Sequence, residues 1–366
     1  MCHTLNFAPK GRCIPAGKSH MPYIDAVYFL GIILVVWGHS HPLDSSWWGT
    51  WYSDLNGFIY TFHMPLYFFI GGYLLVHSHS IDQSEYKAWA KEKLLKFLVP
   101  YIVLTFLAYV PKAMLGDTTD VVELSLGYLL KTTFLVPRIG VWGHFWFIPT
   151  FLVLDLLWGV WRAKAPKNPT VYRRGLLIGG AVSLLLAVFP IHTDCFVLYD
   201  LSQEAVFYAC GILLALVRPV LWDKTWKHLT GITAGSFCAY LLYPYGNYMN
   251  RSIPAINFVV GLALVWVCWC VAQFLSKLRW DILVKLTKYS FNIFVYSWPA
   301  QAALDALLRR LGVNWLVIIA ILFVAGFVCP LLIIAVYKRM CFLHCRFFDY
   351  LIGVKTVATR KEPIHS

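Results

Sequence analysis

The chain has 366 residues, of which 59% are hydrophobic and only 13% are charged. A water-soluble protein of this composition would expose more apolar surface than such proteins tolerate, so the sequence excludes a soluble globular enzyme. The formal net charge of +13 would suit a nucleic-acid-binding protein, but the distribution of the basic residues indicates membrane topology, and we expect no nucleic acid partner.

Ten apolar segments follow one another along the chain, each about long enough to cross the hydrocarbon core of a bilayer. No linker rich in Gly, Ser or Pro separates them, so we expect a single domain over residues 1–366. The sequence predicts an all-α polytopic membrane protein with ten transmembrane helices, an N-terminal segment over 1–22 and a tail over 338–366. The predicted spans are 24–43, 56–76, 97–111, 141–161, 175–190, 203–217, 228–244, 253–276, 289–308 and 314–337.

The basic residues lie mainly on one side of the predicted spans. With a cytoplasmic N-terminus, 25 of the 31 Lys and Arg residues fall in cytoplasmic segments and the other six fall outside. This asymmetry follows the positive-inside rule, and an even number of spans returns the chain to the side where it started. We therefore expect both termini to be cytoplasmic, with membrane lipids around the spans.

Three histidines in different predicted spans reach a similar depth in the bilayer. The rise of a helix, about 1.5 Å per residue, places His39 about 21 Å across the membrane and His63 about 10 Å below its outer surface. His144 begins the fourth span on the same side, and His41 lies just beyond the first span. Ionisable groups are costly in lipid and usually face the interior of a bundle, so we expect one shared polar site near the outer face.

The residues leave three interpretations of these imidazoles open. Each can be a core histidine that is hydrogen-bonded to a neighbouring helix, or a group that transfers protons near neutral pH. Three imidazoles and a water molecule could also bind zinc, but no carboxylate is placed in the sequence to orient them. We therefore expect no metal.

Four segments carry distinctive motifs: YIDAVYFLGIILVVWGHS over 23–40, FHMPLYFFIGGY over 62–73, KLLK over 93–96 with Pro-Tyr shortly after it, and FWFIP over 145–149. In this order they resemble the motifs of the integral-membrane acyltransferase-3 family, and in particular its fucose 4-O-acetylase-like branch. The first two motifs are the specific ones. The resemblance extends over nearly the whole chain.

This resemblance implies a membrane O-acyltransferase that moves an acyl group, usually acetyl, from cytosolic acetyl-CoA to a hydroxyl of a glycan or a lipid-linked sugar. It also implies a bacterial inner membrane and an essential catalytic role for His39. An imidazole at that depth can remove the proton of an acceptor hydroxyl while the oxygen attacks the thioester. We expect His39 and His63 to be the catalytic residues.

The donor is made in the cytoplasm, whereas the catalytic imidazoles are predicted near the outer face. We expect Lys93 and Lys96, one helical turn apart at the inner start of the third span, to bind the CoA phosphates while the pantetheine arm enters the bundle. An ordinary basic flank is the alternative for both lysines. Asp25 could orient them or stabilise its helix N-terminus, and Tyr28, also assigned to the donor side, occupies a position where the family usually has Arg or Lys.

On the acceptor side we expect His41, His144, Trp146 and Ser297 to contact the sugar. Ser297 belongs to KYSFNIFVYSWP over 288–299 and stands where many members of the family have a second histidine. The tryptophans of the first outer loop can either stack on a sugar or lie in an interfacial aromatic belt.

Two other functions stay open on the sequence alone. A proton-coupled transporter or flippase would use the same histidines to relay protons while a glycan or polar solute crosses unmodified, although the chain shows no inverted repeat. A catalytically silent member of the family is the third alternative, because Tyr28 replaces the usual cation. Transfer of label from acetyl-CoA to a glycan separates these alternatives.

Overall fold

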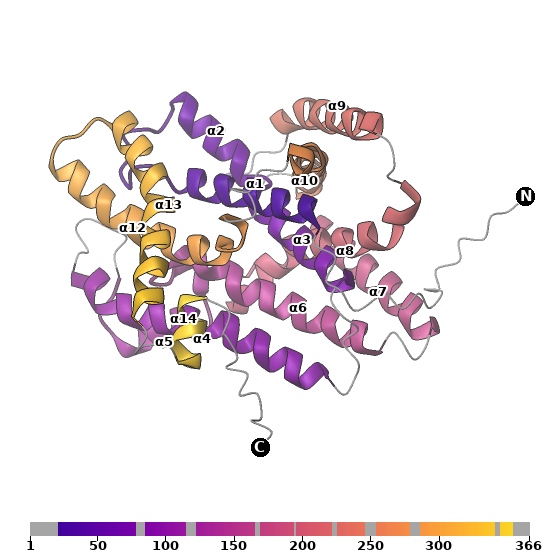
Figure 1. The fold of residues 1–366 in the computed structure, drawn as a ribbon, viewed down its shortest axis with the longest axis horizontal. Coiled ribbons are helices and arrows are strands. Elements are labelled where there is room, and N and C mark those ends of the chain that lie inside the picture. The colour runs from indigo at the N-terminus through magenta and orange to yellow at the C-terminus, as the bar shows by residue number, and fades with distance from the viewer. Residues whose placement is uncertain are drawn as a thin grey trace, which may run out of the picture.

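The structure of the protein is a computed structural model that describes residues 21–77, 85–114, 122–164, 169–193, 195–221, 225–245, 254–278, 286–340 and 345–353. Every regular element in these ranges is a helix, and none of them contains a β-strand (Figure 1). The predicted all-α class is therefore confirmed. Most of the predicted N-terminal segment and a large part of the predicted tail lie outside the described residues.

The helices follow the predicted spans in chain order, with three additional short α-helices. The α-helices are α1 (Pro22–Gly38), α2 (Trp51–Tyr60), α3 (His63–His77), α4 (Tyr86–Met114), α5 (Leu126–Phe134), α6 (Phe147–Lys164), α7 (Pro169–Val188), α8 (Leu198–Leu221), α9 (Thr225–Leu242), α10 (Pro254–Leu275), α12 (Ser290–Arg310), α13 (Trp315–Arg339) and α14 (Arg346–Ile352). The 3-10 turns are η1 (Pro137–Ile139), η2 (Gly143–Trp146), η4 (Cys195–Val197), η5 (Tyr243–Tyr245) and η6 (Ser276–Leu278).

Seven helical segments of the described chain are long and apolar enough to cross a membrane. They correspond to α2 with α3, and to α4, α6, α7, α8, α10 and α13. Helix α1 is apolar but has only 17 residues, and α12 carries Asp305, Arg309 and Arg310 near its C-terminal end. The predicted spans at α1, α9 and α12 are therefore the three that are not among these seven segments. The protein is thus a multi-pass membrane protein, while ten spans and cytoplasmic termini stay predictions.

The distribution of polarity over the bundle is the reverse of that in a soluble protein. Large apolar side chains are exposed on the outer helices, such as Leu177 and Leu185 on α7 and Val324 and Leu332 on α13. Polar side chains are instead buried between helices, such as Asp155 of α6, which pairs with Lys93 of α4. Lipid solvates apolar surface and cannot satisfy polar groups, so this distribution fits a bilayer.

Helices α3 and α8 cross in direct backbone contact near the middle of the bundle (Figure 1). A Cβ atom added to Gly72 would lie 1.9 Å from the carbonyl oxygen of Tyr208, and one added to Gly211 would lie 1.9 Å from that of Phe69. Only glycine allows this approach, which is how membrane helices gain close packing without a hydrophobic driving force. The crossing anchors α3.

The second predicted span, 56–76, is interrupted between α2 and α3 at Thr61 and Phe62. Pro65 has no N–H to donate to the carbonyl oxygen of Thr61 four residues earlier, so the regular helical ladder fails there. The first predicted span, 24–43, likewise ends early, at Gly38. His39 and His63 consequently lie at helix boundaries rather than inside uninterrupted spans.

Candidate functional site

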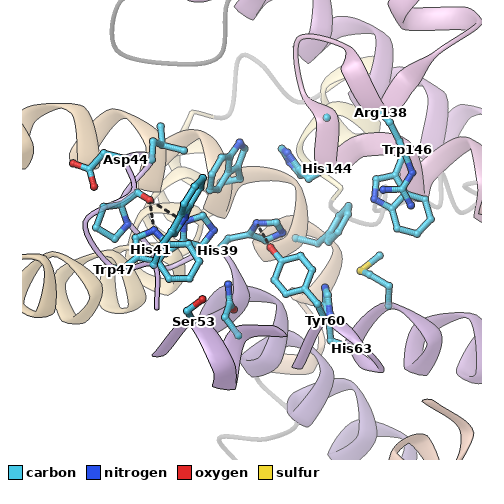
Figure 2. Close-up of a pocket in the computed structure, with 18 of the residues that line it drawn as sticks. His39, His41, Asp44, Trp47, Ser53, Tyr60, His63, Arg138, His144 and Trp146 are labelled. Carbon is cyan, nitrogen blue, oxygen red and sulfur yellow. Dashed lines mark hydrogen bonds between the residues drawn. The ribbon is translucent and has the colours of Figure 1, made fainter. Parts of the chain in front are cut away.

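A cavity of about 740 Å³ lies at the end of the bundle where α1 and α4 end and where α3 and α6 begin (Figure 2). The loop after α1, helix α2 and the middle of α12 complete its wall. Four histidines from three separate parts of the chain line it, namely His39, His41, His63 and His144. The structure therefore brings the imidazoles from the three predicted spans into one site.

His39 is the C-cap residue of α1, directly after Gly38, and its imidazole has a defined hydrogen-bond environment. Its Nδ1 atom lies 3.4 Å from the hydroxyl oxygen of Tyr60, which itself lies 3.1 Å from the carbonyl oxygen of Gly38. A carbonyl oxygen only accepts, so the Tyr60 hydroxyl donates to Gly38 and accepts from the Nδ1–H of His39. This arrangement leaves a lone pair on Nε2 of the neutral His39 ring.

The surroundings of His39 are aromatic. Its ring centroid lies 5.0 Å from that of Trp298 on α12 and 5.7 Å from that of His144. Tyr60 stands between His39 and His63, with its ring 6.1 Å from the first and 4.7 Å from the second (Figure 2). A hydroxyl group that enters the cavity beside His39 thus meets apolar ring surfaces and few competing donors.

His63 opens α3 and is fixed by a backbone bond. Its Nδ1 atom lies 3.1 Å from the carbonyl oxygen of Ile59, one turn earlier. The carbonyl accepts, so Nδ1 carries the hydrogen and the lone pair of the neutral ring is on Nε2. His39 and His63 thus share one tautomer, in which Nε2, the ring nitrogen farther from the backbone, carries the lone pair.

His144 differs from the other two because its ring nitrogens lack protein partners. Both Nδ1 and Nε2 are buried, and no protein group among the residues that the structure describes forms a hydrogen bond with them. A buried polar atom left without a partner costs about 1–3 kcal/mol. The ring of His144 is therefore suited to bind a polar ligand, with one nitrogen that donates and one that accepts.

His41 and Trp47 form the part of the wall contributed by the loop after α1. Their ring centroids are 4.5 Å apart, and the carbonyl oxygen of Pro42 lies 3.0 Å from Nδ1 of His41 and accepts the indole N–H of Trp47 at 2.9 Å. The shared contact with Pro42 holds both flat rings in place in the cavity wall. Flat apolar rings with polar edges are surfaces on which a sugar can stack.

Trp146 lies in η2 and faces the cavity from the side of His144 (Figure 2). The guanidinium of Arg138 lies over its ring, 4.3 Å from the centroid, and Nε of Arg138 donates to Asp200 at 2.7 Å. Three of the four expected acceptor-side residues, His41, His144 and Trp146, therefore line the same cavity.

Ser297, the fourth expected acceptor residue, is placed elsewhere. Only 1% of its surface is exposed, and it does not contribute to the cavity wall, whereas its neighbour Trp298 does. Successive residues of an α-helix point about 100° apart, so neighbours in the sequence face different surroundings. Sequence position alone did not distinguish them.

The residues expected to bind the donor lie toward the other end of α4. Lys93 precedes Lys112, a cavity residue near the end of the same helix, by 19 positions, which corresponds to about 28 Å. Nζ of Lys93 pairs with Asp155 of α6 at 2.5 Å, and the hydroxyl of Tyr208 donates to the other carboxylate oxygen at 2.5 Å. Lys96 is exposed, with Nζ 5.6 Å from the ring of Phe291.

Asp25 and Tyr28 lie on the half of α1 that is far from the cavity. Asp25 is in the first turn of α1 and accepts a hydrogen bond from the hydroxyl of Thr287 at 3.3 Å, while the helix has no side-chain cap bond at its N-terminus. Tyr28 packs against Tyr67, with 6.0 Å between ring centroids. Neither residue contributes to the cavity wall.

The cavity residues that the sequence did not predict include Tyr60, Lys112, Arg138 and Trp298. Two of them carried a readable signal, because Lys112 and Arg138 belong to the few basic residues predicted outside and so run against the positive-inside trend. Trp298 belongs to the motif over 288–299, next to Ser297, whereas Tyr60 carried no signal. No group of three His, Cys, Asp or Glu side chains in the described ranges could hold a metal ion.

Comparison with known families adds one finding. The family model described as an acyltransferase domain matches residues 21–335, a range that contains every residue of the cavity wall. No curated protein and no solved structure matches the chain.

Proposed function

The chain belongs to the acyltransferase-3 family, and on that premise we propose that it is an O-acyltransferase that takes an acetyl group from acetyl-CoA and esterifies a hydroxyl of a glycan or lipid-linked sugar. We place it in a bacterial inner membrane, as in the fucose 4-O-acetylase-like branch. The observation that carries the proposal is the contact of His39 Nδ1 with the Tyr60 hydroxyl, which directs the lone pair of the neutral ring to Nε2, in the same cavity as the unpaired ring nitrogens of His144.

The proposed reaction is a single displacement at the thioester carbonyl. Nε2 of His39 accepts the proton of the acceptor hydroxyl while the oxygen forms a bond to the carbonyl carbon. The carbon–sulfur bond then breaks, and the departing sulfur takes the proton from the imidazolium of His39. The products are the sugar ester and CoA with a free thiol, and His39 returns to its neutral form.

Other cavity residues have supporting roles in this proposal. His63 presents a second Nε2 lone pair on the other side of Tyr60 and is the second catalytic imidazole. His144 binds a sugar hydroxyl through its ring nitrogens, and the flat rings of Trp146 and His41 stack on the sugar. Together they orient the acceptor toward His39. Orientation of the reacting groups raises the reaction rate more than binding of the acceptor alone.

The donor is proposed to approach from the opposite end of α4. Lys96 is exposed there and suits a phosphate group, and Lys93, which pairs with Asp155, lies one helical turn before it. Along α4, Lys96 lies about 24 Å from the level of Lys112. Because phosphates do not enter lipid, the uncharged pantetheine arm is the part of CoA that has to span this distance between the helices.

The proposal is tested with purified protein in sealed vesicles that contain a surface-glycan fraction. We expect radiolabel from acetyl-CoA supplied on one side to appear in ester linkage on the glycan, and mild alkali to release it. A glycan that crosses the bilayer without label would instead identify a flippase. Label in neither glycan nor lipid, with glycan that stays in place, would contradict both functions.

Tyr60 is expected to set the tautomer of His39. In Tyr60→Phe the ring stays but the hydroxyl that accepts from Nδ1 is lost, so His39 populates both tautomers. One hydrogen bond of about 0.5–1.5 kcal/mol corresponds to a fall in kcat of about 2- to 10-fold. Steady-state acetyl transfer measures this, with KM for acetyl-CoA unchanged.

Tyr240→Phe is the matched control, because Tyr240 is exposed on α9 and does not line the cavity. Its kcat should equal that of the unmodified protein. A Tyr60→Phe variant that changes KM for acetyl-CoA but leaves kcat intact would show that Tyr60 acts on the donor and does not orient His39.

A further inference from the structure

Helix α1 ends at Gly38 without the usual C-terminal signal. Many helices are closed by a glycine in the left-handed conformation, but the next residue here is His39, with φ −101° and ψ 1°. The last carbonyl groups of a helix have no N–H donor one turn later, so they need partners from elsewhere. The place where α1 stops, and with it the direction of His39, therefore depends on contacts with other helices.

Gln301 of α12 supplies such a contact at the end of α1. Its Nε2 atom lies 3.2 Å from the carbonyl oxygen of Val36 and 2.9 Å from Oγ of Ser40. The same atom lies 3.1 Å from the carbonyl oxygen of Leu322 on α13. Carbonyl oxygens only accept, so this atom is the amide nitrogen, and it donates. One side chain thus joins three helices and holds α1 on both sides of His39.

The space around Gln301 fits this side chain closely. The residue is fully buried, and a Cβ atom on Gly326 of α13 would lie 2.8 Å from its Nε2, so the glycine leaves the space that the amide occupies. Its Oε1 atom is buried and receives no hydrogen bond within the described part of the chain. A buried acceptor without a donor lowers stability, so an apolar side chain of the same size would suit the fold at least as well. The contacts with α1 are the feature that the amide adds.

The same face of α12 also contacts the chain at and after His39. Trp298, Gln301 and Asp305 are three and four positions apart, which places them on one side of the helix. The ring of Trp298 lies 5.0 Å from that of His39, and Oδ2 of the buried Asp305 accepts the backbone N–H of Leu43 at 3.1 Å. Helix α12 therefore fixes the segment that leaves α1 at several points.

The direction of the His39 ring depends on where α1 stops. Each residue added to or lost from the helix turns the next side chain by about 100° about the helix axis. The contact of Nδ1 with the hydroxyl of Tyr60, at 3.4 Å, exists only in the present direction. A helix end that shifts or frays would break this contact and leave the tautomer of the ring undetermined.

We propose that Gln301 is a positioning residue for proton transfer at His39. Its bonds to Val36 and Ser40 end α1 at Gly38 and thereby direct Nε2 of His39 into the cavity. The inference rests on the proposed O-acyltransferase function, in which His39 is the base. Gln301 itself does not line the cavity, so it acts only through His39.

The first test is steady-state acetyl transfer by Gln301→Met, which keeps the length of the side chain and removes the amide. We expect kcat to fall about 10- to 100-fold, because a catalytic group displaced by about 1 Å loses its alignment. KM for acetyl-CoA and for the acceptor should be unchanged. Gln273→Met is the matched control, because Gln273 lies on α10 and does not line the cavity, and it should keep full activity. An unchanged kcat in Gln301→Met overturns the proposal.

Thermal unfolding distinguishes positioning from a purely structural role. The unfolding midpoint of Gln301→Met in detergent should lie within about 3 °C of that of the unmodified protein. A lower midpoint, with a loss of folded protein that accounts for the loss of activity, overturns the proposal. If Gln301→Met does not fold, Ser40→Ala takes its place, because it removes one of the two contacts on α1. Its kcat should fall about 2- to 10-fold, and an unchanged kcat overturns the proposal.

The tautomer of His39 is a second readout, and it does not require turnover. Nitrogen NMR of histidine-labelled protein in nanodiscs distinguishes the protonated ring nitrogen from the unprotonated one, and the His39 signals are those that His39→Ala lacks. In the unmodified protein they should report hydrogen on Nδ1. In Gln301→Met the two signals should move toward each other, as in Tyr60→Phe. Signals that stay in place overturn the proposal.

A double variant shows whether Gln301 acts through His39. If Gln301 and Tyr60 both orient the same ring, Gln301→Met/Tyr60→Phe should lose less kcat than the product of the two single losses. A loss equal to that product shows that Gln301 acts elsewhere and contradicts the proposal.

The two readouts also separate this inference from the function on which it rests. Altered His39 signals in Gln301→Met, together with no acetyl transfer by the unmodified protein, keep the positioning of His39 and contradict the O-acyltransferase. Acetyl transfer that Gln301→Met catalyses as fast as the unmodified protein keeps the enzyme and contradicts the inference.

Discussion

His39→Ala is expected to abolish acetyl transfer at unchanged protein level. The substitution removes the only group in the proposed reaction that takes the proton from the attacking hydroxyl, and general-base catalysis of this kind contributes about 10²- to 10⁴-fold to a rate. The alanine leaves space beside Tyr60 and Trp298, so the fold should persist. Transfer of radiolabel from acetyl-CoA to the glycan in vesicles measures the loss.

The loss should appear in kcat and should depend on where the histidine lies. His192→Ala is the matched control, because His192 is exposed in the loop after α7 and does not line the cavity. It should retain full activity. If His39→Ala stays active while His63→Ala does not, His63 is the base, and the assignment made from the Tyr60 contact is wrong.

The pair formed by Lys93 and Asp155 is expected to stabilise the fold. Asp155 is only 2% exposed and also accepts from Tyr208, so Asp155→Leu leaves a lysine and a hydroxyl without their acceptor inside the bundle. Breaking a buried pair costs about 3–5 kcal/mol, and the lower end applies because 30% of the Lys93 side chain is exposed. Unfolding in detergent should show this loss.

The double variant Lys93→Met/Asp155→Leu decides between this structural role and donor binding. If the pair is structural, removing both charges should recover most of the lost stability and leave KM for acetyl-CoA unchanged. If Lys93 also holds a CoA phosphate, KM should rise in the double variant. Arg346→Gln is the control, because its ion pair with Glu92 is exposed and worth at most about 1 kcal/mol.

The histidine cluster shows how far depth along the chain can predict a site. The number of residues between each histidine and the end of its predicted span places His39, His63 and His144 at similar depths, and helical geometry makes this calculation reliable. Depth is one coordinate only. Which way each ring points depends on helix rotation, and the tautomer of His39 depends on Tyr60, a residue with no distinctive sequence context.

Ser297 and Lys93 are two residues for which a prediction from the sequence did not match the contacts in the structure. Ser297 lies at a suitable depth but is buried away from the cavity, because the rotation of α12 about its axis is set by packing against α13 and α1. Lys93 has the sequence context of a phosphate ligand, yet in the structure it pairs with Asp155, which lies 62 residues later in the chain. Contacts between distant segments decide both cases.

The sequence by itself determined that the protein is helical, resides in a membrane and belongs to an acyltransferase family, because apolar segment length and linear motifs are properties of the local chain. The tertiary structure alone decided which side chains share the cavity. Helix crossings such as that of α3 with α8, at Gly72 and Gly211, set how the crossing helices are rotated and spaced. These packing contacts join residues far apart in the chain, so no local sequence pattern records them.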